Sequence, residues 1–202
     1  ICSIGGVSGQ RAKKGKLDSD EWKRLWSAQK IINSTKIFID DTSSVSITGM
    51  KAKLRRVKNL GLVVIDYLQL MQSEHRTDNR AQEVAEISRS MKIMAKELNI
   101  PVICCAQLSR ATESRQVKKP MLSELRDSGA IEQDADVVIF LYRDEYYKNQ
   151  EGESSVPSDS EQNIAEIIVA KNRHGSAETV KVGWTGRYTK FRELANEDYL
   201  PS

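Results

Sequence analysis

The sequence is poor in the residues that build metal centres and disulfide frameworks. Its 202 residues include two histidines and three cysteines, and the cysteines do not have the spacing of a zinc-binding motif. A zinc site is therefore not expected, and an odd number of cysteines without a framework fits a reducing cytoplasm. Cys104 and Cys105 are neighbours in an apolar run, which predicts two buried thiols.

Long apolar runs are missing as well. No stretch approaches the roughly 20 residues of a membrane-spanning helix, and the first residues show no signal-peptide pattern. We therefore expect a cytoplasmic protein without a membrane partner. The chain begins with Ile1 rather than Met, which indicates a fragment or a processed product.

The remaining composition is that of an ordinary globular domain. The apolar fraction is 39% and the charged fraction 29%, and the length is sufficient for one α/β domain with a core. The net charge of +3 is compatible with an anionic partner but does not require one.

Apolar residues at helical spacing predict three main helices. They begin after Asp18, Ser46 and Asn79, and the first has a glutamate in the position that completes a capping box. We expect Trp22 and Trp26, on the first helix, to pack in the core.

Runs of apolar residues predict strands. Six segments have this character: 37–39, 62–66, 102–106, 137–141, 164–170 and 179–184. The first is expected to be short and buried, and the next three to be parallel strands buried on both faces. The alternation of strands and helices predicts an α/β fold with a mostly parallel sheet flanked by helices. We also expect short helices at 121–135 and a mobile loop at 148–162.

Polar residues follow two of the predicted strands, where sites form in parallel sheets. Asp66 comes after four apolar residues, which suits a carboxylate that holds Mg²⁺ beside nucleotide phosphates, with a helix or turn cap as the alternative. The amide of Gln107 suits a γ-phosphate or its attacking water, although an ordinary loop residue is the simpler explanation.

A basic turn follows another predicted strand, at 170–175 (AKNRHG). Lys171 and Arg173 lie two residues apart, so both point the same way in an extended chain. Two such cations suit a γ-phosphate bound by a neighbouring subunit. A solvent-exposed basic turn explains the spacing equally well.

Residues 125–136 (LRDSGAIEQDAD) combine a cation with small residues. Arg126 supplies the charge, and Gly129 allows main-chain N–H groups to approach a phosphate closely. The polar, basic loop at 108–120 would help to hold a nucleic-acid backbone. Since no aromatic residue lies between 108 and 136, contact with phosphates is favoured over base stacking. A capped turn is the alternative.

Taken together, four segments resemble the DnaB-type replicative DNA helicases, and they occur in the order of that family. They are 64–71 (VIDYLQLM), similar to the Walker B segment; 106–110 (AQLSR); 125–136; and 171–175 (KNRHG), similar to the arginine-finger turn. The likeness extends over about residues 3–191, and it implies a RecA-like ATPase domain.

The resemblance implies a nucleotide site shared between subunits. Asp66 would hold Mg²⁺, Gln107 would sense the γ-phosphate, and Arg173 with support from Lys171 would reach the ATP of the adjacent subunit.

The resemblance also implies residues that touch DNA and the base of the nucleotide. Arg126, Asp127 and Gly129 would lie in the loop that grips single-stranded DNA. Tyr188 and Phe191 would lie near the nucleotide base, with a place in a β-strand core as the alternative.

The sequence departs from the family in lacking its phosphate-binding loop, G-x-x-x-x-G-K-[ST]. The pair Gly15-Lys16 is followed by Leu17, so it does not form the motif. The resemblance implies that the catalytic glutamate, the first strand of the sheet and an N-terminal collar domain are missing too. We therefore expect residues 1–202 to be one partial domain, truncated at its N-terminal side and without ATPase activity of its own.

The implied parent protein is an ATP-dependent DNA helicase. A hexameric ring would move along single-stranded DNA and unwind the duplex at the replication fork, with a primase and a helicase loader as partners in a primosome. Two alternatives remain: another RecA-like ATPase such as a recombinase, or a non-catalytic module for nucleic-acid binding or assembly.

Overall fold

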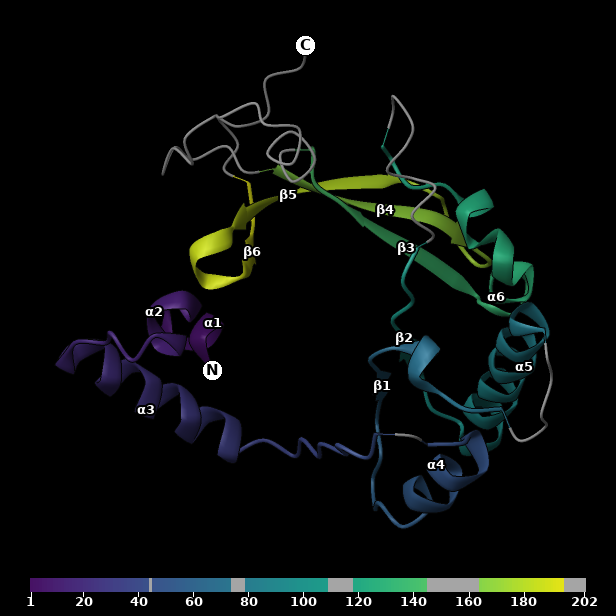
Figure 1. Cartoon of the computed structure of the whole chain (residues 1–202), viewed down its shortest axis with the longest axis horizontal. Coiled ribbons are helices and arrows are strands. Elements are labelled where there is room, and N and C mark those ends of the chain that lie inside the picture. Colours follow the sequence, from purple (N-terminus) through teal and green to yellow (C-terminus); the bar gives the residue numbers. More distant parts are fainter. Residues whose placement is uncertain (44, 74–78, 109–117, 145–163, 195–202) are drawn as a thin grey trace. The chain divides into compact units, whose positions relative to one another are not determined.

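The computed structural model describes residues 1–43, 45–73, 79–108, 118–144 and 164–194 (Figure 1). The chain divides into two compact units. The first unit comprises Ile1–Asp40, Leu141–Ile168 and Thr179–Ser202; the second comprises Asp41–Phe140 and Val169–Glu178. The predicted mobile loop at 148–162, and most of the basic loop at 108–120, lie outside the described residues.

Three helices begin the first unit: α1 (Cys2–Gly5), α2 (Gly9–Lys13) and α3 (Ser19–Asn33). The capping box predicted for α3 is present. The Asp18 carboxylate accepts a hydrogen bond from the Glu21 amide at 2.8 Å, and the Glu21 carboxylate accepts one from the Asp18 amide at 3.1 Å. These bonds satisfy main-chain donors that have no partner within the helix.

The glutamate of this capping box is also the charged residue that ties α2 to α3. Glu21 is buried, and its carboxylate meets the guanidinium of Arg11 at 3.0 Å. A buried charge is costly without a partner, and here the arginine supplies one. Gly5 lies where a Cβ atom would be 3.2 Å from the Arg24 carbonyl oxygen, so glycine allows α1 to approach α3 closely.

The expected core positions of the two tryptophans of α3 were wrong. The inner face of α3 is formed by Glu21 and Ala28, which are seven residues apart and both buried. Trp22 and Trp26 belong to the neighbouring face and are 50% and 61% exposed. The helical periodicity was correct, but the apolar stripe was assigned to the wrong side.

The expected strand at 37–39 was also wrong. Ile37, Phe38 and Ile39 are 64%, 77% and 88% exposed, and residues 35–43 have no regular structure. Within the described part of the chain no strand pairs with this segment, so its main chain has no ladder to join.

The second unit is built around two helices, a pair of strands and a 3₁₀ turn. They are α4 (Ile47–Leu54), β1 (Val63–Ile65), η1 (Leu68–Leu70), α5 (Arg80–Leu98) and β2 (Val102–Cys104). Both helices begin where the sequence predicts. The side chains of Ser46 and Asn79 accept hydrogen bonds from main-chain amides of the first turns of α4 and α5.

The core of the second unit lies between these helices and the β1–β2 pair. It consists of Ile47, Val63, Ile65, Leu68, Met71, Val84, Ile87, Met91 and Met94. Each large apolar side chain that is fully buried contributes about 1.5–3 kcal/mol to folding. The apolar residues that recur at helical spacing in α5 therefore form part of the core.

The strands β1 and β2 are parallel, as expected, but they are not buried on both faces. Val64 and Ile103, which point away from the core, are 60% and 53% exposed. In the described residues α4 and α5 pack on one face only, and alternate side chains of a strand point to opposite faces. The buried-thiol prediction was wrong for Cys105, which is exposed, whereas burial raises the pKa of the half-buried Cys104 to about 12.

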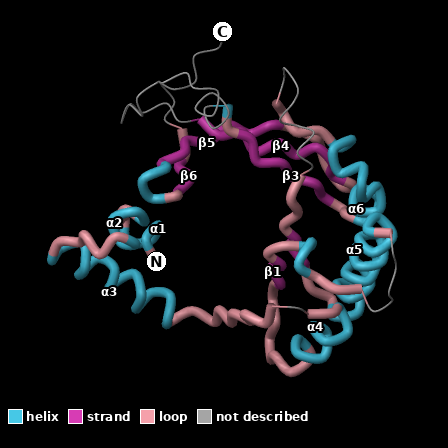
Figure 2. The backbone as a smooth tube through the Cα atoms, in the orientation of Figure 1, coloured by secondary structure: helices cyan, strands magenta, loops and turns pink. Residues whose placement is uncertain are grey.

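The chain continues through short helices into a second sheet (Figure 2). The helices are η3 (Leu122–Ser128) and α6 (Gly129–Asp134), which occupy the segment expected to hold short helices. The strands are β3 (Val137–Tyr142), β4 (Ile164–Asn172), β5 (Thr179–Thr185) and β6 (Lys190–Arg192), with η4 (Gly186–Tyr188) before the last.

The four strands of the second sheet lie in the order β3-β4-β5-β6. β4 and β5 are antiparallel and flank the predicted basic turn, and β6 is antiparallel to β5. β3 alternates buried and exposed residues, so it too is covered on one face rather than two. Of the three strands expected to be parallel in one sheet, β1 and β2 pair with each other, whereas β3 belongs to this second sheet, so the expectation was wrong for β3. None of the helices described is long and apolar enough to cross a membrane.

Candidate functional site

The ends of β1 and β2 form what we call the strand edge, which consists of Asp66, Gln69 and Gln107. The parallel register pairs Ile65 with Cys104, so the residues that follow both strands emerge on one side. Main-chain bonds extend the pairing further: the Cys105 amide donates to the Ile65 carbonyl at 2.9 Å. The two strand-end residues predicted from the sequence are therefore brought to the same edge.

Gln69 fixes the main chain at this edge. Its amide nitrogen donates to the Gln107 carbonyl at 3.1 Å, and its amide oxygen accepts from the Gln107 N–H at 3.3 Å. Arg80, at the start of α5, donates to the Gln69 carbonyl at 3.0 Å. Sequence reasoning did not single out Gln69, although it lies in the segment 64–71. Its role depends on a residue 38 positions away, which no local pattern reveals.

The side chains at the strand edge suit a hydrated cation and a phosphate. Asp66 and Gln107 are both exposed residues. A carboxylate is the oxygen ligand that Mg²⁺ prefers, and a neutral amide donates to or accepts from a phosphate or a water molecule. The donor set of the strand edge therefore fits a magnesium–nucleotide complex.

The two predicted cations lie at the C-terminal end of α6, which Figure 1 shows beside α5. The Lys171 ammonium donates to the Glu132 carbonyl, and the Arg173 guanidinium donates to the Gln133 carbonyl at 2.5 Å. The last carbonyls of a helix have no partner within it and carry partial negative charge, so they attract cations. As expected from their spacing, both side chains of the basic turn reach the same neighbour.

A carboxylate completes this arrangement. Asp136 Oδ1 lies 3.6 Å from Arg173 Nη1, and the Asp136 carbonyl accepts from the Arg173 N–H at 2.9 Å. The Lys92 ammonium, on α5, binds the other carboxylate oxygen. We call the carbonyls of Glu132 and Gln133, together with Asp136, the α6 seat.

Charge keeps the carboxylate of the α6 seat ionised. The hydrogen bond from Lys92 and, to a smaller extent, the positive charges of Lys92 and Arg173 hold the pKa of Asp136 below its ordinary value. The role of Asp136 was missed at the sequence level because 125–136 was interpreted as a DNA-contacting segment, and its link to Arg173 spans 37 positions.

The candidate DNA segment begins at the other end of α6. The main chain of Arg126 and Asp127 belongs to η3, and their side chains lie outside the described parts of the chain. Gly129 begins α6, is exposed, and has open space where a Cβ atom would project. The main chain is therefore accessible at this point.

The two aromatic residues predicted near a nucleotide base lie in the first unit. Phe191 is 43% exposed, and its ring centroid lies 4.8 Å from that of Trp184. The Arg187 guanidinium lies 5.5 Å from the centroid of the Tyr188 ring. Phe191 thus has a packing partner within the antiparallel sheet, and it keeps nearly half of its surface.

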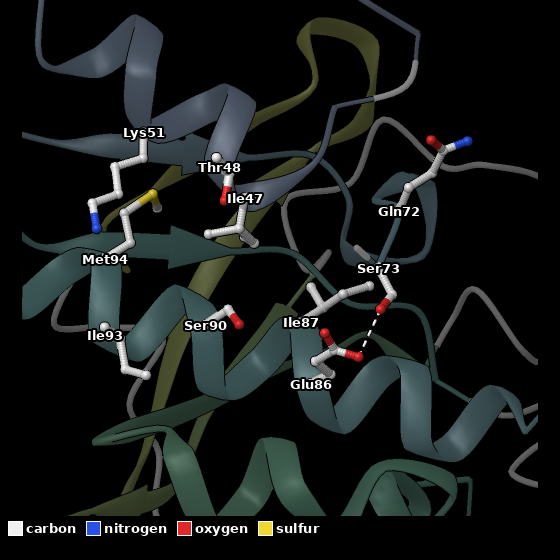
Figure 3. Close-up of a pocket in the computed structure, with 10 residues that line it drawn as sticks. All are labelled: Ile47, Thr48, Lys51, Gln72, Ser73, Glu86, Ile87, Ser90, Ile93 and Met94. Carbon is white, nitrogen blue, oxygen red and sulfur yellow. Dashed lines mark hydrogen bonds between the residues drawn. The ribbon is translucent and has the colours of Figure 1, made fainter. Parts of the chain in front are cut away.

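A shallow pocket of about 160 Å³ lies between α4 and α5 (Figure 3). Its wall is partly polar, with a hydrogen bond of 2.7 Å from Ser73 to Glu86. Lys51 lines it as well, and its ammonium pairs with Glu97. The predicted site residues are not among the residues that line this pocket.

Comparison with known sequences places this geometry in a family. Residues 1–193 match the family described as "DnaB-like helicase C terminal domain". The chain is 47% identical over 198 residues to "Replicative DNA helicase DnaB" of Geobacillus stearothermophilus and 46% identical over 198 residues to "Replicative DNA helicase DnaC" of Bacillus subtilis (strain 168). In both cases the match covers 96% of this chain and 42% of the relative.

Comparison with solved structures agrees. A structure described as an ATPase domain matches with a TM-score of 0.85 and 39% identity, over 96% of this chain and 68% of that one. A structure described as a DnaB-like replicative helicase and its interactions with primase also matches with a TM-score of 0.85 and 39% identity, over 96% of this chain and 47% of that one. These matches confirm the predicted RecA-like α/β fold. The chain, which spans about two-fifths of the length of the curated relatives named here, belongs to the family of DnaB-like helicase C-terminal domains.

Proposed function

We propose that this chain is the motor segment of a replicative DNA helicase. The complete protein would form a hexameric ring, hydrolyse ATP between subunits, and unwind duplex DNA at the replication fork while moving along single-stranded DNA. The observation that carries this proposal is the convergence of Asp66 and Gln107 at one edge of a parallel strand pair. The family to which the chain belongs supports it.

The strand edge would bind the magnesium–ATP complex. Asp66 would hold Mg²⁺, through water or directly, and Gln107 would contact the γ-phosphate or the attacking water. When bound, Mg²⁺ would neutralise charge on the phosphate oxygens. Gln69 would keep the Gln107 main chain in place, since two hydrogen bonds join the two residues. Tyr188 and Phe191 would contact the nucleotide base.

The basic turn would act on the ATP of a neighbouring subunit. Arg173, supported by Lys171, would stabilise negative charge that develops during phosphoryl transfer. The Arg173 side chain is 45% exposed, which leaves it accessible to a second chain. An arginine supplied in trans raises turnover by about 10³–10⁵-fold in other phosphoryl-transfer enzymes.

The segment at the start of α6 would contact the DNA backbone. Arg126, Asp127 and Gly129 would line the channel of the ring, and the exposed main chain at Gly129 supports a close approach by phosphate. Charge contacts of this kind make affinity depend on salt, with a slope of about −0.7 for each phosphate neutralised on a single strand.

The partners proposed for the complete protein are single-stranded DNA, further copies of itself, a primase and a helicase loader, in the cytoplasm. The similar structure described with primase interactions supports the primase. We further propose that residues 1–202 alone do not hydrolyse ATP. Turnover by the purified chain that disappears in the Asp66→Ala variant, and is therefore not contamination, would contradict this.

The decisive experiment is Arg173→Ala in the complete protein. We expect ATP turnover to fall by at least about 10³-fold, while the affinity for a fluorescent ATP analogue changes little, because the side chain acts on the neighbour's nucleotide. Mixing the variant with an Asp66→Ala variant should restore some turnover, since a ring then contains interfaces with both residues intact. Unchanged turnover in Arg173→Ala would remove the trans-acting role.

The DNA proposal has its own test. Arg126→Ala in the complete protein should weaken binding to oligo-dT and reduce the salt slope by about 0.7, as expected for one lost phosphate contact. Lys30→Ala, which removes an exposed charge from α3, serves as the comparison and should leave the salt slope unchanged. An unchanged salt slope in Arg126→Ala would show that this arginine does not contact the backbone.

A further inference from the structure

We propose that Asp136 is a positioning residue for Arg173. This inference rests on the proposed function, because it gives Arg173 a task in ATP turnover. Asp136 binds Arg173 at two points: its carbonyl accepts from the Arg173 N–H at 2.9 Å, and its carboxylate lies 3.6 Å from the guanidinium. Asp136 therefore contacts both the main-chain amide and the guanidinium of Arg173.

The α6 seat adds directional acceptors for the same cation. The Gln133 carbonyl accepts from the guanidinium at 2.5 Å, and the neighbouring Glu132 carbonyl accepts from Lys171. Since the last carbonyls of a helix are fixed by the helix itself, they provide acceptors at set positions. Both cations of the basic turn are therefore aligned on one rigid element.

The seat is itself held by the core helix α5. Lys92 binds the second carboxylate oxygen of Asp136, which fixes the orientation of that carboxylate. Four residues earlier on α5, the buried Ser88 donates to the Asp134 carboxylate at 2.9 Å. The C-terminal end of α6 and Asp136 are thus bonded to two successive turns of α5. These bonds fix the position of Arg173 relative to the core of the second unit.

This arrangement holds the cation without covering it. The Arg173 side chain remains 45% exposed, so part of the guanidinium faces solvent while Asp136 and Gln133 restrain it. A side chain that is already ordered loses less freedom when it meets its ligand, and catalytic groups lose much of their effect when they are displaced by about 1 Å. We infer that Asp136 sets the geometry in which Arg173 meets a neighbouring triphosphate.

The α6 seat also links this cation to the candidate DNA segment. α6 has six residues, which correspond to about 9 Å of helix. Its first residue, Gly129, belongs to the candidate DNA segment, and its last carbonyls bind the two cations. A displacement of α6 would therefore move Lys171 and Arg173 together, so Asp136 is expected to matter most when DNA is bound.

The test is Asp136→Asn in the complete protein, assayed for ATP turnover with and without oligo-dT. Asparagine keeps the shape and the main-chain bond but removes the charge. We expect kcat to fall by about 10- to 100-fold while KM for ATP stays within about twofold, because the interaction is realised in the transition state. Asp136→Glu, which restores the charge, should recover part of the loss.

The matched control is Asp134→Asn, at the same end of α6 but bonded to Ser88 rather than to the cations. Because the asparagine oxygen still accepts the hydrogen bond from Ser88, this anchor is kept, and kcat should stay within about twofold. An equal loss of kcat in both variants would show that Asp136 acts through general integrity of the helix, and would overturn the proposal.

A double variant separates positioning from an independent role. In an Arg173→Lys background the Asp136→Asn substitution should cost much less than it does alone, because residues that act as a unit are not additive. If Asp136→Asn lowers kcat by the same factor in the Arg173→Lys background as it does alone, the proposal is overturned. If Arg173→Ala abolishes turnover but Asp136→Asn leaves it unchanged, this inference fails and the proposed function stands; if Arg173→Ala has no effect, both fail.

Discussion

The strand edge and the α6 seat hold their candidate functional residues in different ways. At the strand edge, the bonds between Gln69 and Gln107 fix the main chain, while the Asp66 and Gln107 residues are exposed. At the α6 seat, the charged groups of Lys171 and Arg173 are themselves held by carbonyl oxygens. The side chains of the edge are thus free to adapt to the proposed Mg²⁺ and phosphate, whereas the seat aligns its cations by bonds within the chain itself.

The largest effect that would test this contrast is expected from Asp66→Ala in the complete protein. Removing the carboxylate that is proposed to hold Mg²⁺ should lower ATP turnover by about 100-fold or more and raise the Mg²⁺ concentration needed for half-maximal rate. Asp66→Glu should keep part of the activity. A steady-state assay across a Mg²⁺ titration measures both quantities, and an unchanged Mg²⁺ requirement would assign Asp66 to a turn cap.

The second effect concerns the core beneath the strand edge. Ile87, on α5, is 1% exposed and belongs to the cluster that includes Val63 and Ile65 of β1. Ile87→Ala should reduce the free energy of unfolding by about 2–5 kcal/mol, measured by urea denaturation followed by circular dichroism. The control is Ile93→Ala on the same helix. Ile93 is 48% exposed, so its substitution should reduce the free energy of unfolding far less. Equal losses would place the core elsewhere.

Local patterns in the sequence were sufficient for much of the fold. The capping residues Asp18, Ser46 and Asn79 mark the helix starts correctly because each cap bonds to an amide within three residues. The inner face of α5 was also predictable, since the helical repeat fixes which residues share a side. Both features are set by neighbours along the chain.

Features that depend on distant partners were not predictable. The exposure of Val64 and Ile103 is decided by what packs on each face of the β1–β2 pair, and an apolar strand looks the same in either case. The exposure of Trp22 has the same origin, because periodicity gives a stripe but not the partner that covers it. For the candidate site, strand-end position correctly predicted that Asp66 and Gln107 share an edge, whereas the bonds of Gln69 and Asp136 cross 37 or more positions.

The third effect tests whether the hydrogen bonds from Gln69 are needed to hold the main chain of the strand edge. Gln69→Ala removes the bonds to the Gln107 N–H and carbonyl, so the loop that carries Gln107 should become less ordered. Each such bond contributes roughly 0.5–1.5 kcal/mol, and we expect turnover of the complete protein to fall by about 3- to 10-fold. Gln69→Glu keeps the acceptor for the Gln107 N–H, so its turnover should lie between that of the wild type and that of Gln69→Ala. A rate equal to that of the wild type would show that the loop is held by other contacts.

The smallest effect is expected from the charge of the α6 seat. The hydrogen bond from Lys92, with the nearby positive charges, lowers the pKa of Asp136 from its ordinary value of 3.8, so ionised Asp136 stabilises the folded state. This stabilisation is complete above pH 3.8 and is lost as the pH falls through the lower pKa of the folded protein. Since the carboxylate is 49% exposed, solvent screening limits it to roughly 0.5 kcal/mol.

Urea denaturation of the chain between about pH 6 and pH 2.5 measures this contribution. Asp136→Asn should be slightly less stable than the wild type at the upper pH, and the two should converge at the acid end, where the wild-type carboxylate becomes protonated. Asp134→Asn controls for an amide at the same end of α6. A difference between Asp136→Asn and the wild type that persists unchanged to the acid end would mean that the charge of Asp136 does not contribute. The α6 seat would then depend on main-chain bonds, as the strand edge does.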